Sequence, residues 1–195
     1  MSAKGTFRSG VAVSTLLFAL AFSGYGRQAR LADYKNNLAP RSPSPEHAVD
    51  KMLEMANLKP GETLYDLGCG DGRILIAAAE KYKVRAVGIE ISDDLAKTAA
   101  EKVKKAGLQT QIKVVHGNFM QTDLSGASVV TLYLATTAND MLRPNLERYL
   151  RPNTRVVSYD YPIPGWKPVD TAETHGRHGA THMIYLYEVP DSVKK

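Results

Sequence analysis

The sequence predicts an α/β protein built on a mostly parallel sheet, and three observations lead to that prediction. Short apolar runs alternate with helical patterns along most of the chain, as in proteins built from βαβ units. One of these runs leads into a glycine-rich turn within Leu64–Ile74, where a strand passes into a helix. The segment Thr181–Val189 alternates strictly between apolar and polar residues, which predicts an antiparallel strand closing one edge of the sheet.

The first helix is expected within Ser42–Leu58, directly before the alternating part of the chain. Ser44 can cap this helix, Pro45 fits its first turn, and Glu46 suits the positive end of the helix dipole. Apolar residues then recur at helical spacing and should face a core. These residues are Val49, Met52, Leu53 and Ala56.

The remaining strands and helices follow from the period of the apolar residues and from the turn residues between the runs. Strands are expected at Thr63–Leu67, Arg85–Ile89, Gln111–Val115, Ser128–Leu134 and Thr154–Tyr159. Helices are expected at Gly72–Lys81, Asp93–Ala106 and Asn139–Tyr149.

The excess of positive charge lies at the beginning of the chain. Of the 195 residues, the first 45 hold six Lys and Arg against one acid, which leaves 19 basic and 19 acidic residues in the body. A neutral body argues against a large nucleic-acid-binding face, so no nucleic-acid partner is expected. The single cysteine, Cys69, excludes an intramolecular disulfide and a multi-cysteine zinc site.

The beginning of the chain predicts a targeting or anchoring segment. Lys4 and Arg8 precede the apolar run Val11–Phe22, and small residues follow it. This order is typical of a signal peptide, with an uncleaved membrane anchor and a mitochondrial presequence as alternatives. The predicted organisation is therefore a signal or anchor at 1–23, a linker at 24–43 and one domain at 44–195.

Three glycines at alternate positions, Gly68, Gly70 and Gly72, follow the strand expected at Thr63–Leu67. Glycines at such a place let the backbone turn tightly and approach a ligand where a Cβ would clash. The ligand then lies over the N-terminus of the following helix. The dinucleotide fingerprint G-x-G-x-x-G would need a glycine at Arg73, which argues against an NAD-dependent oxidoreductase.

Two carboxylates accompany the glycines. Asp66 precedes the first glycine by two residues, where a carboxylate suits a cationic ligand and repels a pyrophosphate. Glu90 ends the next strand, 22 residues after Gly68, where a ribose-binding acid belongs because a carboxylate accepts bonds from two vicinal hydroxyls. S-adenosylmethionine is a ligand that carries an ammonium, a sulfonium and a ribose but no phosphate.

Three segments, Leu64–Asp66, Gly68–Gly72 and Val87–Glu90, resemble the nucleotide-binding motifs of class I S-adenosylmethionine-dependent methyltransferases. The resemblance runs from about Pro43 to Val189. It implies a Rossmann-like class I methyltransferase fold with a mostly parallel seven-stranded sheet and an antiparallel edge. It also implies S-adenosylmethionine as cofactor, bound by the loop and the two acids, with Ile91 beside them.

A finer resemblance links the chain to small bacterial relatives of the ATP synthase c-subunit lysine methyltransferase. In that subgroup a Pro-Thr-Pro-Glu segment before the first helix helps close the cofactor site, and here Pro43–Glu46 places Ser44 at the threonine position. The lysine-methylating relatives typically carry Pro-Gln after the fourth strand, where this chain has Ala135–Thr137. This difference leaves the acceptor open between a protein lysine and a small molecule.

Two further residues near the loop belong to this prediction. Asn118 follows the third strand, where the superfamily usually presents Asp or Asn to adenine, and Phe119 is expected to pack on the adenine face. The alternative for Asn118 is a turn residue. Cys69 lies inside the glycine loop, where a small residue is needed, and it is interpreted as packing rather than as a nucleophile.

The acceptor side is less constrained by the sequence. Tyr133 and Asp160 are the candidate catalytic residues, because an amine acceptor needs a desolvated pocket with a hydroxyl or carboxylate. Asp160 opens a segment with Tyr161, Pro162 and Trp166 that forms either an acceptor pocket or an aromatic packing corner.

Two polar groups have plainer interpretations. Asn139 and Asp140 are interpreted as helix caps. The histidines His175, His178 and His182 have a spacing that mimics metal ligands but lack a helical frame, so a loop is predicted and no metal is assigned.

The function predicted from the sequence is an S-adenosylmethionine-dependent methyltransferase, with a protein lysine as one candidate acceptor. A cofactor-binding protein without catalysis is the alternative of another class. The positive charges after the apolar run, on Arg27, Arg30 and Lys35, are at least as many as those before it, on Lys4 and Arg8. Because positive residues tend to stay on the cytoplasmic side, an anchored chain is predicted to keep its body there. An anchor would suit a membrane-protein lysine as acceptor.

Overall fold

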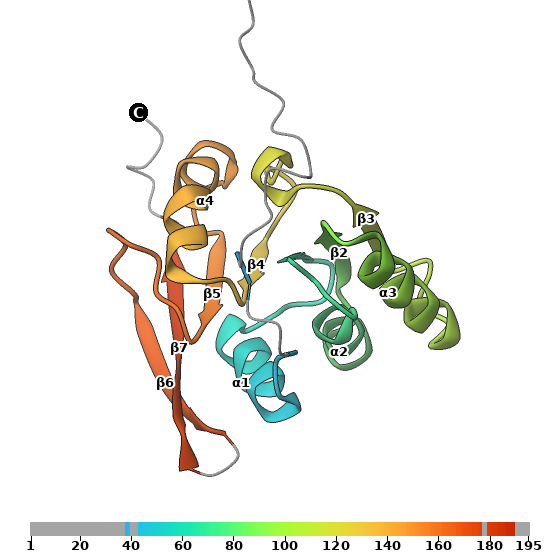
Figure 1. Cartoon of the computed structure of the whole chain (residues 1–195), viewed down its shortest axis with the longest axis horizontal. Coiled ribbons are helices and arrows are strands. Elements are labelled where there is room, and N and C mark those ends of the chain that lie inside the picture. The colour runs from blue at the N-terminus through green and yellow to red at the C-terminus, as the bar shows by residue number, and fades with distance from the viewer. Residues whose placement is uncertain (1–37, 40–42, 177–178, 190–195) are drawn as a thin grey trace, which may run out of the picture.

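The computed structural model describes residues 38–39, 43–176 and 179–189, which form one seven-stranded sheet with helices on both sides (Figure 1). The strands are β1 (Thr63–Leu67), β2 (Arg85–Glu90), β3 (Ile112–His116), β4 (Val129–Leu132), β5 (Arg155–Tyr159), β6 (Asp170–His175) and β7 (Thr181–Glu188). The helices are α1 (Glu46–Ala56), α2 (Arg73–Tyr82), α3 (Asp93–Lys105) and α4 (Thr136–Tyr149), and a short 3-10 turn, η2 (Phe119–Gln121), follows β3. The apolar run Val11–Phe22 and most of the predicted linker lie outside the described residues.

The strands are ordered β3-β2-β1-β4-β5-β7-β6 across the sheet. The first five strands in the chain are parallel to one another, and β7 pairs antiparallel with β5 and with β6. The predicted α/β class, the mostly parallel seven-stranded sheet and its antiparallel edge are therefore confirmed. The order reverses between β1 and β4, and the carboxyl ends of the strands at such a switch point form the ligand crevice of open α/β sheets.

The antiparallel edge differs from the prediction in one respect. β7 was expected to close the sheet, but it lies between β5 and β6, and β6 is the outermost strand. β6 was not predicted, because its sequence Asp170–His175 is polar and mostly exposed and carries no apolar alternation. Only one of its six residues, Thr174, is buried.

Each face of the sheet is covered by its own hydrophobic cluster. Figure 1 shows α1, α2 and α3 along one side of the sheet and α4 along the other. The cluster beneath α1 and α2 includes Met52, Leu53 and Leu75, all with no exposed surface. The cluster beneath α4 includes Leu142 and Leu146, which are equally buried. The sheet is thus buried on both faces, as parallel sheets are.

The core-facing residues predicted for the first helix are confirmed, and its cap is not. Val49, Met52, Leu53 and Ala56 are 0–3% exposed. Pro45 occupies the N-cap position, however, and no side chain caps the helix. Ser44 is instead buried, 6% exposed, in the segment that leads into the helix.

Glycine is required in β2 for a reason of packing. A Cβ built on Gly88 would lie 2.5 Å from Leu75 Cδ1 and 2.6 Å from Cys69 Sγ, both far inside van der Waals contact. Cys69 is therefore wedged between β2 and α2, and burial raises the pKa of its thiol. The structure agrees with a packing role for this cysteine.

We predict that Gly88→Ala lowers the free energy of unfolding by about 1–3 kcal/mol, because Leu75 and Cys69 must shift to make room. Gly117→Ala is the matched control, since its new Cβ would have its nearest neighbour at an ordinary 3.7 Å. Urea denaturation of both variants measures the difference. Equal midpoints for the two variants would contradict the packing argument.

Candidate active site

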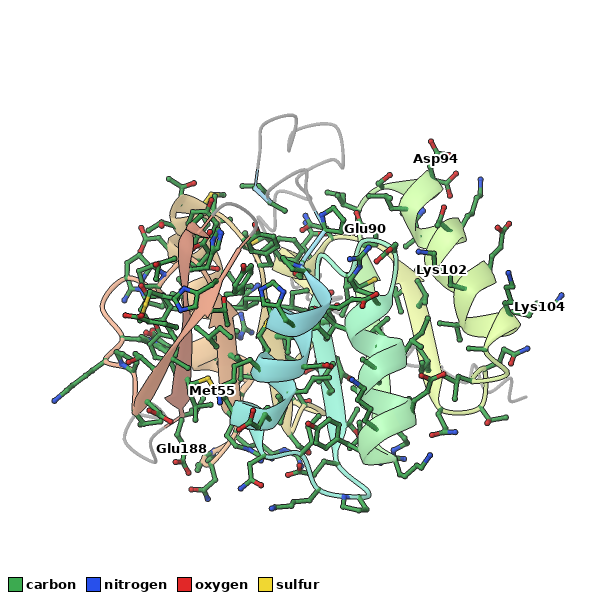
Figure 2. The ribbon with its side chains drawn as sticks, turned by 90° about the horizontal axis from the view of Figure 1, so that it is seen from below. Met55, Glu90, Asp94, Lys102, Lys104 and Glu188 are labelled. Carbon is green, nitrogen blue, oxygen red and sulfur yellow. The ribbon has the colours of Figure 1, made fainter. Side chains whose placement is uncertain are left out.

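The glycine loop between β1 and α2 is tied to the end of β2 by one carboxylate. Glu90 Oε2 accepts a hydrogen bond of 2.8 Å from the backbone nitrogen of Gly70, and Oε1 accepts one of 2.9 Å from that of Ser92. Glu90 is only 6% exposed. Figure 2 shows Glu90 in the upper middle part of the molecule, whereas Met55, near the C-terminal end of α1, lies in its lower part. The predicted ribose-binding acid therefore also holds the loop in place.

The three glycines of the loop differ in what surrounds them. Gly68, Gly70 and Gly72 all have positive φ, which disfavours side chains. A Cβ on Gly72 would lie 3.2 Å from that of Ala99, so this glycine permits α2 to approach α3. A Cβ on Gly70 would meet no atom within 4 Å. Gly70 thus faces open space, next to a cavity of about 230 Å³ that the loop borders.

Asp66 is a buried carboxyl in the wall of the same cavity, 3% exposed. The hydroxyl of Thr131, on the neighbouring strand β4, donates a hydrogen bond of 2.8 Å to its Oδ1. Burial raises the pKa of Asp66 to about 7; the Thr131 hydrogen bond opposes this, and the charges of Glu90 and Asp71 add to it. The side chain therefore changes charge near neutral pH and favours a cationic neighbour.

An ion-pair network joins the glycine loop to the segment before α1. Arg73 donates to both carboxylate oxygens of Asp71, at 2.9 and 2.8 Å, and its third nitrogen donates to the backbone oxygen of Ser44 at 2.9 Å. Lys102 on α3 also contacts Asp71, at 2.7 Å. The hydrogen bond from Arg73 and that from Lys102 hold the pKa of Asp71 well below its usual range. Arg73, noted in the sequence only for excluding a dinucleotide motif, thus connects two parts of the site.

The third strand delivers the residues predicted to meet an adenine. Asn118 caps η2, since its Oδ1 accepts a hydrogen bond of 2.9 Å from the backbone nitrogen of Met120. Its Nδ2 is buried and has no partner in the described part of the chain. Phe119 is 4% exposed and packs into the cluster beneath α4. Ile91 follows β2, and its carbonyl oxygen lies 3.1 Å from His116 Nε2.

A larger cavity of about 710 Å³ adjoins the first one. Three residues, Pro43, Arg73 and Tyr133, line both cavities. On the far side the larger cavity is bounded by Tyr159 from β5 and by His182 from β7. The two cavities therefore meet at the carboxyl ends of the parallel strands, on either side of Tyr133.

Aromatic rings cluster around this junction. The ring of Tyr133 lies 4.8 Å from that of Tyr159 and 6.2 Å from that of Tyr161, measured between centroids. Burial, together with the charge of Asp160 and the two neighbouring tyrosines, raises the pKa of Tyr133 to about 12. The phenol of Tyr133 thus stays protonated at physiological pH.

The candidate Asp160 stands next to a residue that the sequence did not suggest. Asp160 Oδ2 lies 3.1 Å from His182 Nδ1, and the ring of His182 is 5.6 Å from that of Tyr159. The buried Nδ1 forms no well-directed hydrogen bond within the described residues, so the pair is a close electrostatic contact. His182 had been grouped with His175 and His178 as a false metal pattern. The contact depends on β7 lying beside β5, which no local pattern in the sequence indicates.

Other predicted positions lie elsewhere. Trp166 donates to Glu147 at 3.1 Å and packs against Tyr187 beneath α4, which makes it the packing corner. Asn139 is no helix cap, because α4 begins three residues earlier; it is fully buried, and its Nδ2 donates to the backbone oxygen of Tyr161 at 3.0 Å. His178 lies outside the described residues, among which no group of three or more His, Cys, Asp or Glu could hold a metal.

The fold and the glycine loop with its two acids define an S-adenosylmethionine-dependent methyltransferase, as the sequence resemblance had implied. The profile of the ANTKMT methyltransferase domain matches residues 66–170, more than half of the chain. The chain belongs to that family.

Individual relatives agree with this assignment. A protein-lysine N-methyltransferase of Saccharolobus islandicus (strain REY15A) is 43% identical over 151 residues, which cover 77% of this chain and 93% of the relative. An adenine nucleotide translocase lysine N-methyltransferase of Mus musculus is 30% identical over 185 residues, 94% of this chain and 76% of the relative.

A solved structure is also similar. The crystal structure of an RNA methyltransferase from Salinibacter ruber in complex with S-adenosyl-L-homocysteine is 41% identical, with a TM-score of 0.73. The alignment covers 77% of this chain and 95% of that one. Over the residues described here, no helix is long and apolar enough to cross a membrane.

We predict that Asp66→Asn stabilises the ligand-free protein at pH 8 by on the order of 2–4 kcal/mol. The carboxyl has a pKa near 3.8 when unfolded and about 7 when folded, so the stability from its protonated form is lost as pH rises between those values. Asparagine keeps an acceptor for the Thr131 hydroxyl without the charge. The gain should shrink towards pH 4.

Thermal unfolding of wild type and Asp66→Asn at pH 4, 6 and 8 measures this effect. A stabilisation of this size raises the midpoint by several degrees in a chain of this length. An Asp66→Asn protein that melts at or below the wild-type temperature at pH 8 would contradict the raised pKa.

Proposed function

We propose that this methyltransferase transfers its methyl group to the side-chain amine of a lysine in a protein. The observation that carries the proposal is the pair of cavities that adjoin at Tyr133. One is bordered by the glycine loop, and the other is lined by Tyr133, Tyr159 and His182, with the carboxylate of Asp160 beside the histidine. An aromatic wall with a carboxylate suits a cationic amine. The names of the lysine methyltransferases from Saccharolobus islandicus and Mus musculus support the same acceptor.

The smaller cavity, which Asp66 and Gly70 line, has the chemistry that S-adenosylmethionine needs together with the ends of β2 and β3 that carry Glu90 and Asn118. Gly70 leaves open space where any Cβ would project, so that a ligand can approach the backbone. Asp66 and Glu90 offer carboxylate oxygens to an ammonium and to ribose hydroxyls. The unpartnered Nδ2 of Asn118 offers a donor, which complements a ring nitrogen of adenine. We therefore assign the cofactor to this cavity.

The residues assigned to hold the cofactor are those predicted from the sequence. They are Ser44, Asp66, Gly68, Gly70, Gly72, Glu90, Ile91, Asn118 and Phe119. Ser44 acts through its backbone oxygen, which accepts a hydrogen bond from Arg73. This bond holds the segment before α1 against the loop. Phe119 supports Asn118 from the core rather than offering a free ring face.

The chemistry divides between the two cavities. When bound, S-adenosylmethionine supplies a methyl group on a sulfonium, which is an excellent leaving group. The protein has to hold the acceptor nitrogen in line, exclude water and remove the amine proton. Tyr133 stands between the cavities and orients the amine as a protonated phenol, and Asp160 lies beside His182, which lines the acceptor cavity.

RNA is the competing acceptor, because the Salinibacter ruber structure is described as an RNA methyltransferase. A nucleic-acid substrate needs a basic surface around the cavity. The one cationic side chain that lines the larger cavity in the described part of the chain is Arg73, which is already paired with Asp71. The formally neutral body also favours a protein acceptor.

The proposal is tested by incubating the purified protein and a host-cell lysate with S-adenosylmethionine labelled in its methyl group. Label is expected in protein that protease digestion releases and RNase does not. Hydrolysis to amino acids should then yield methylated lysine. Label that is lost to RNase, or that resides in small molecules alone, would overturn the proposed acceptor.

We predict that Gly70→Val weakens binding of S-adenosylhomocysteine at least 100-fold, because the side chain would fill the space facing the loop. Gly107→Val is the matched control. Gly107 also has positive φ and no neighbour within 4 Å of a Cβ, so it suffers similar strain away from both cavities. Isothermal titration calorimetry compares the two, and equal losses would point to backbone strain alone.

The finer form of the proposal places the acceptor lysine on a membrane protein, with residues 11–22 as an anchor and the body on the cytoplasmic side. Its support is the apolar run and the basic residues that flank it. An alkaline phosphatase fused after Lys195 in a bacterial host should then stay inactive and keep its full length. Strong phosphatase activity with a shortened product would exclude the anchor.

A further inference from the structure

His182 occupies the far wall of the acceptor cavity and has no role in the proposal so far. β7 runs antiparallel to β5, so its first residues extend past the end of β5 at the carboxyl ends of the parallel strands. There the side chain of His182 is 27% exposed and lines the cavity of about 710 Å³ together with Tyr133 and Tyr159. Its imidazole is thus half-buried among aromatic rings and still open to the cavity.

Two features of the backbone lie close to this ring. Asp160, which lies 3.1 Å from His182 Nδ1, has a φ of +68°, a left-handed conformation that a residue with a Cβ adopts at a cost. On the other side, a Cβ built on Gly176 would lie 2.8 Å from His182 Nε2. The aspartate with a left-handed backbone and the glycine thus lie on two sides of one imidazole, and a left-handed non-glycine residue is often found at a functional site.

The contact with Asp160 determines what the two ring nitrogens do. A carboxylate beside Nδ1 favours the tautomer that carries its proton there. Nε2 then has a free lone pair and acts as a proton acceptor. The ring is thus arranged as a base supported by an acid.

The reaction needs such a base. A free lysine has a pKa of about 10.4, so at neutral pH the acceptor arrives as an ammonium without a lone pair. Tyr133, with its pKa raised to about 12, stays protonated and cannot take the proton. Arg73 is a cation, and Glu46 and His47 are exposed residues on α1. His182 is the half-buried group beside the aromatic rings that can accept the proton.

We propose that His182 is the general base that removes the proton from the acceptor lysine, and that Asp160 is the residue that positions it. The Nζ–H bond of the lysine breaks, its electron pair stays on Nζ, and the proton forms the Nε2–H bond of an imidazolium next to Asp160. The proton later leaves to water. This inference rests on the proposed lysine acceptor.

The charged and titratable groups around His182 come from several elements. Tyr159 is the last residue of β5, Asp160 comes directly after it, and Tyr133 comes directly after β4. Across the larger cavity, Glu46 and His47 belong to α1, and Arg73 belongs to α2.

On β6, the cross-strand partner of His182 is Thr174, whose diagonal neighbours Ala172 and Gly176 are uncharged. Asp160 is thus the acid nearest to the ring in the residues that the structure describes.

The geometry is tested without any acceptor by the tautomer of the ring. Long-range ¹⁵N–¹H spectra of the full chain, saturated with S-adenosylhomocysteine, distinguish a proton on Nδ1 from one on Nε2, and His182→Gln assigns the signal. We expect the Nδ1–H form in wild type and a shift towards the Nε2–H form in Asp160→Asn. An Nε2–H ring in wild type would overturn the proposal.

The role in catalysis is tested by the rate of lysine labelling and its pH dependence, with the lysate acceptor that wild type labels. His182→Gln should be at least 100-fold slower at pH 7.5, while its affinity for S-adenosylhomocysteine stays within twofold of wild type. The deficit should shrink below tenfold at pH 9.5, where the free amine becomes abundant. His175→Gln, an exposed histidine on β6, is the matched control and should label at the wild-type rate.

The outcomes separate this inference from the proposed function. Wild type that labels no protein lysine overturns both. Wild type that labels lysine while His182→Gln labels equally fast overturns the base alone. A deficit in His182→Gln that stays constant from pH 7.5 to 9.5 would mean a structural role and would also overturn it.

Discussion

The carboxylate of Glu90 is the contact on which the rest of the site depends. Its two oxygens receive backbone nitrogens from the loop after β1 and from the turn after β2, which are the two sides of the crevice at the switch point of the sheet. Each bond is charge-assisted and shielded from water, and such bonds are stronger than those between neutral groups. The glycine loop consequently keeps an open conformation that its three glycines alone would not define.

Arg73 connects the glycine loop to the acceptor side of the site. Two nitrogens of its guanidinium donate hydrogen bonds to Asp71, and the third donates one to the backbone oxygen of Ser44. Pro43, next to Ser44, lines both cavities. The position of the segment before α1 therefore depends on the position of the loop. The wall that Pro43 and Arg73 form between the two cavities is held by the hydrogen bonds and the ion pair of Arg73.

The sequence predicted where the residues assigned to the cofactor lie in the fold, because these positions depend on local patterns. Asp66, the three glycines and Glu90 sit at the ends of strands with clear apolar patterns, so their placement follows from the βαβ arrangement. The acceptor half depends on strands that pair far apart in the chain. β6 is polar and exposed, β7 inserts beside β5 rather than at the edge, and only that order brings His182 to Asp160. Asn139 was misjudged for the same reason, because its partners belong to the turn after β5.

The insertion of β7 between β5 and β6 also has a consequence for synthesis on the ribosome. Residues 181–188 emerge after every other strand of the sheet, yet they form the hydrogen bonds that cover the edge of β5. Until they emerge, the nascent chain presents β5 as an open edge, which is a template for wrong pairing. The acceptor cavity lacks one wall for the same interval. A ribosome-bound chain can thus complete its cofactor crevice early, while competence for catalysis waits for β7.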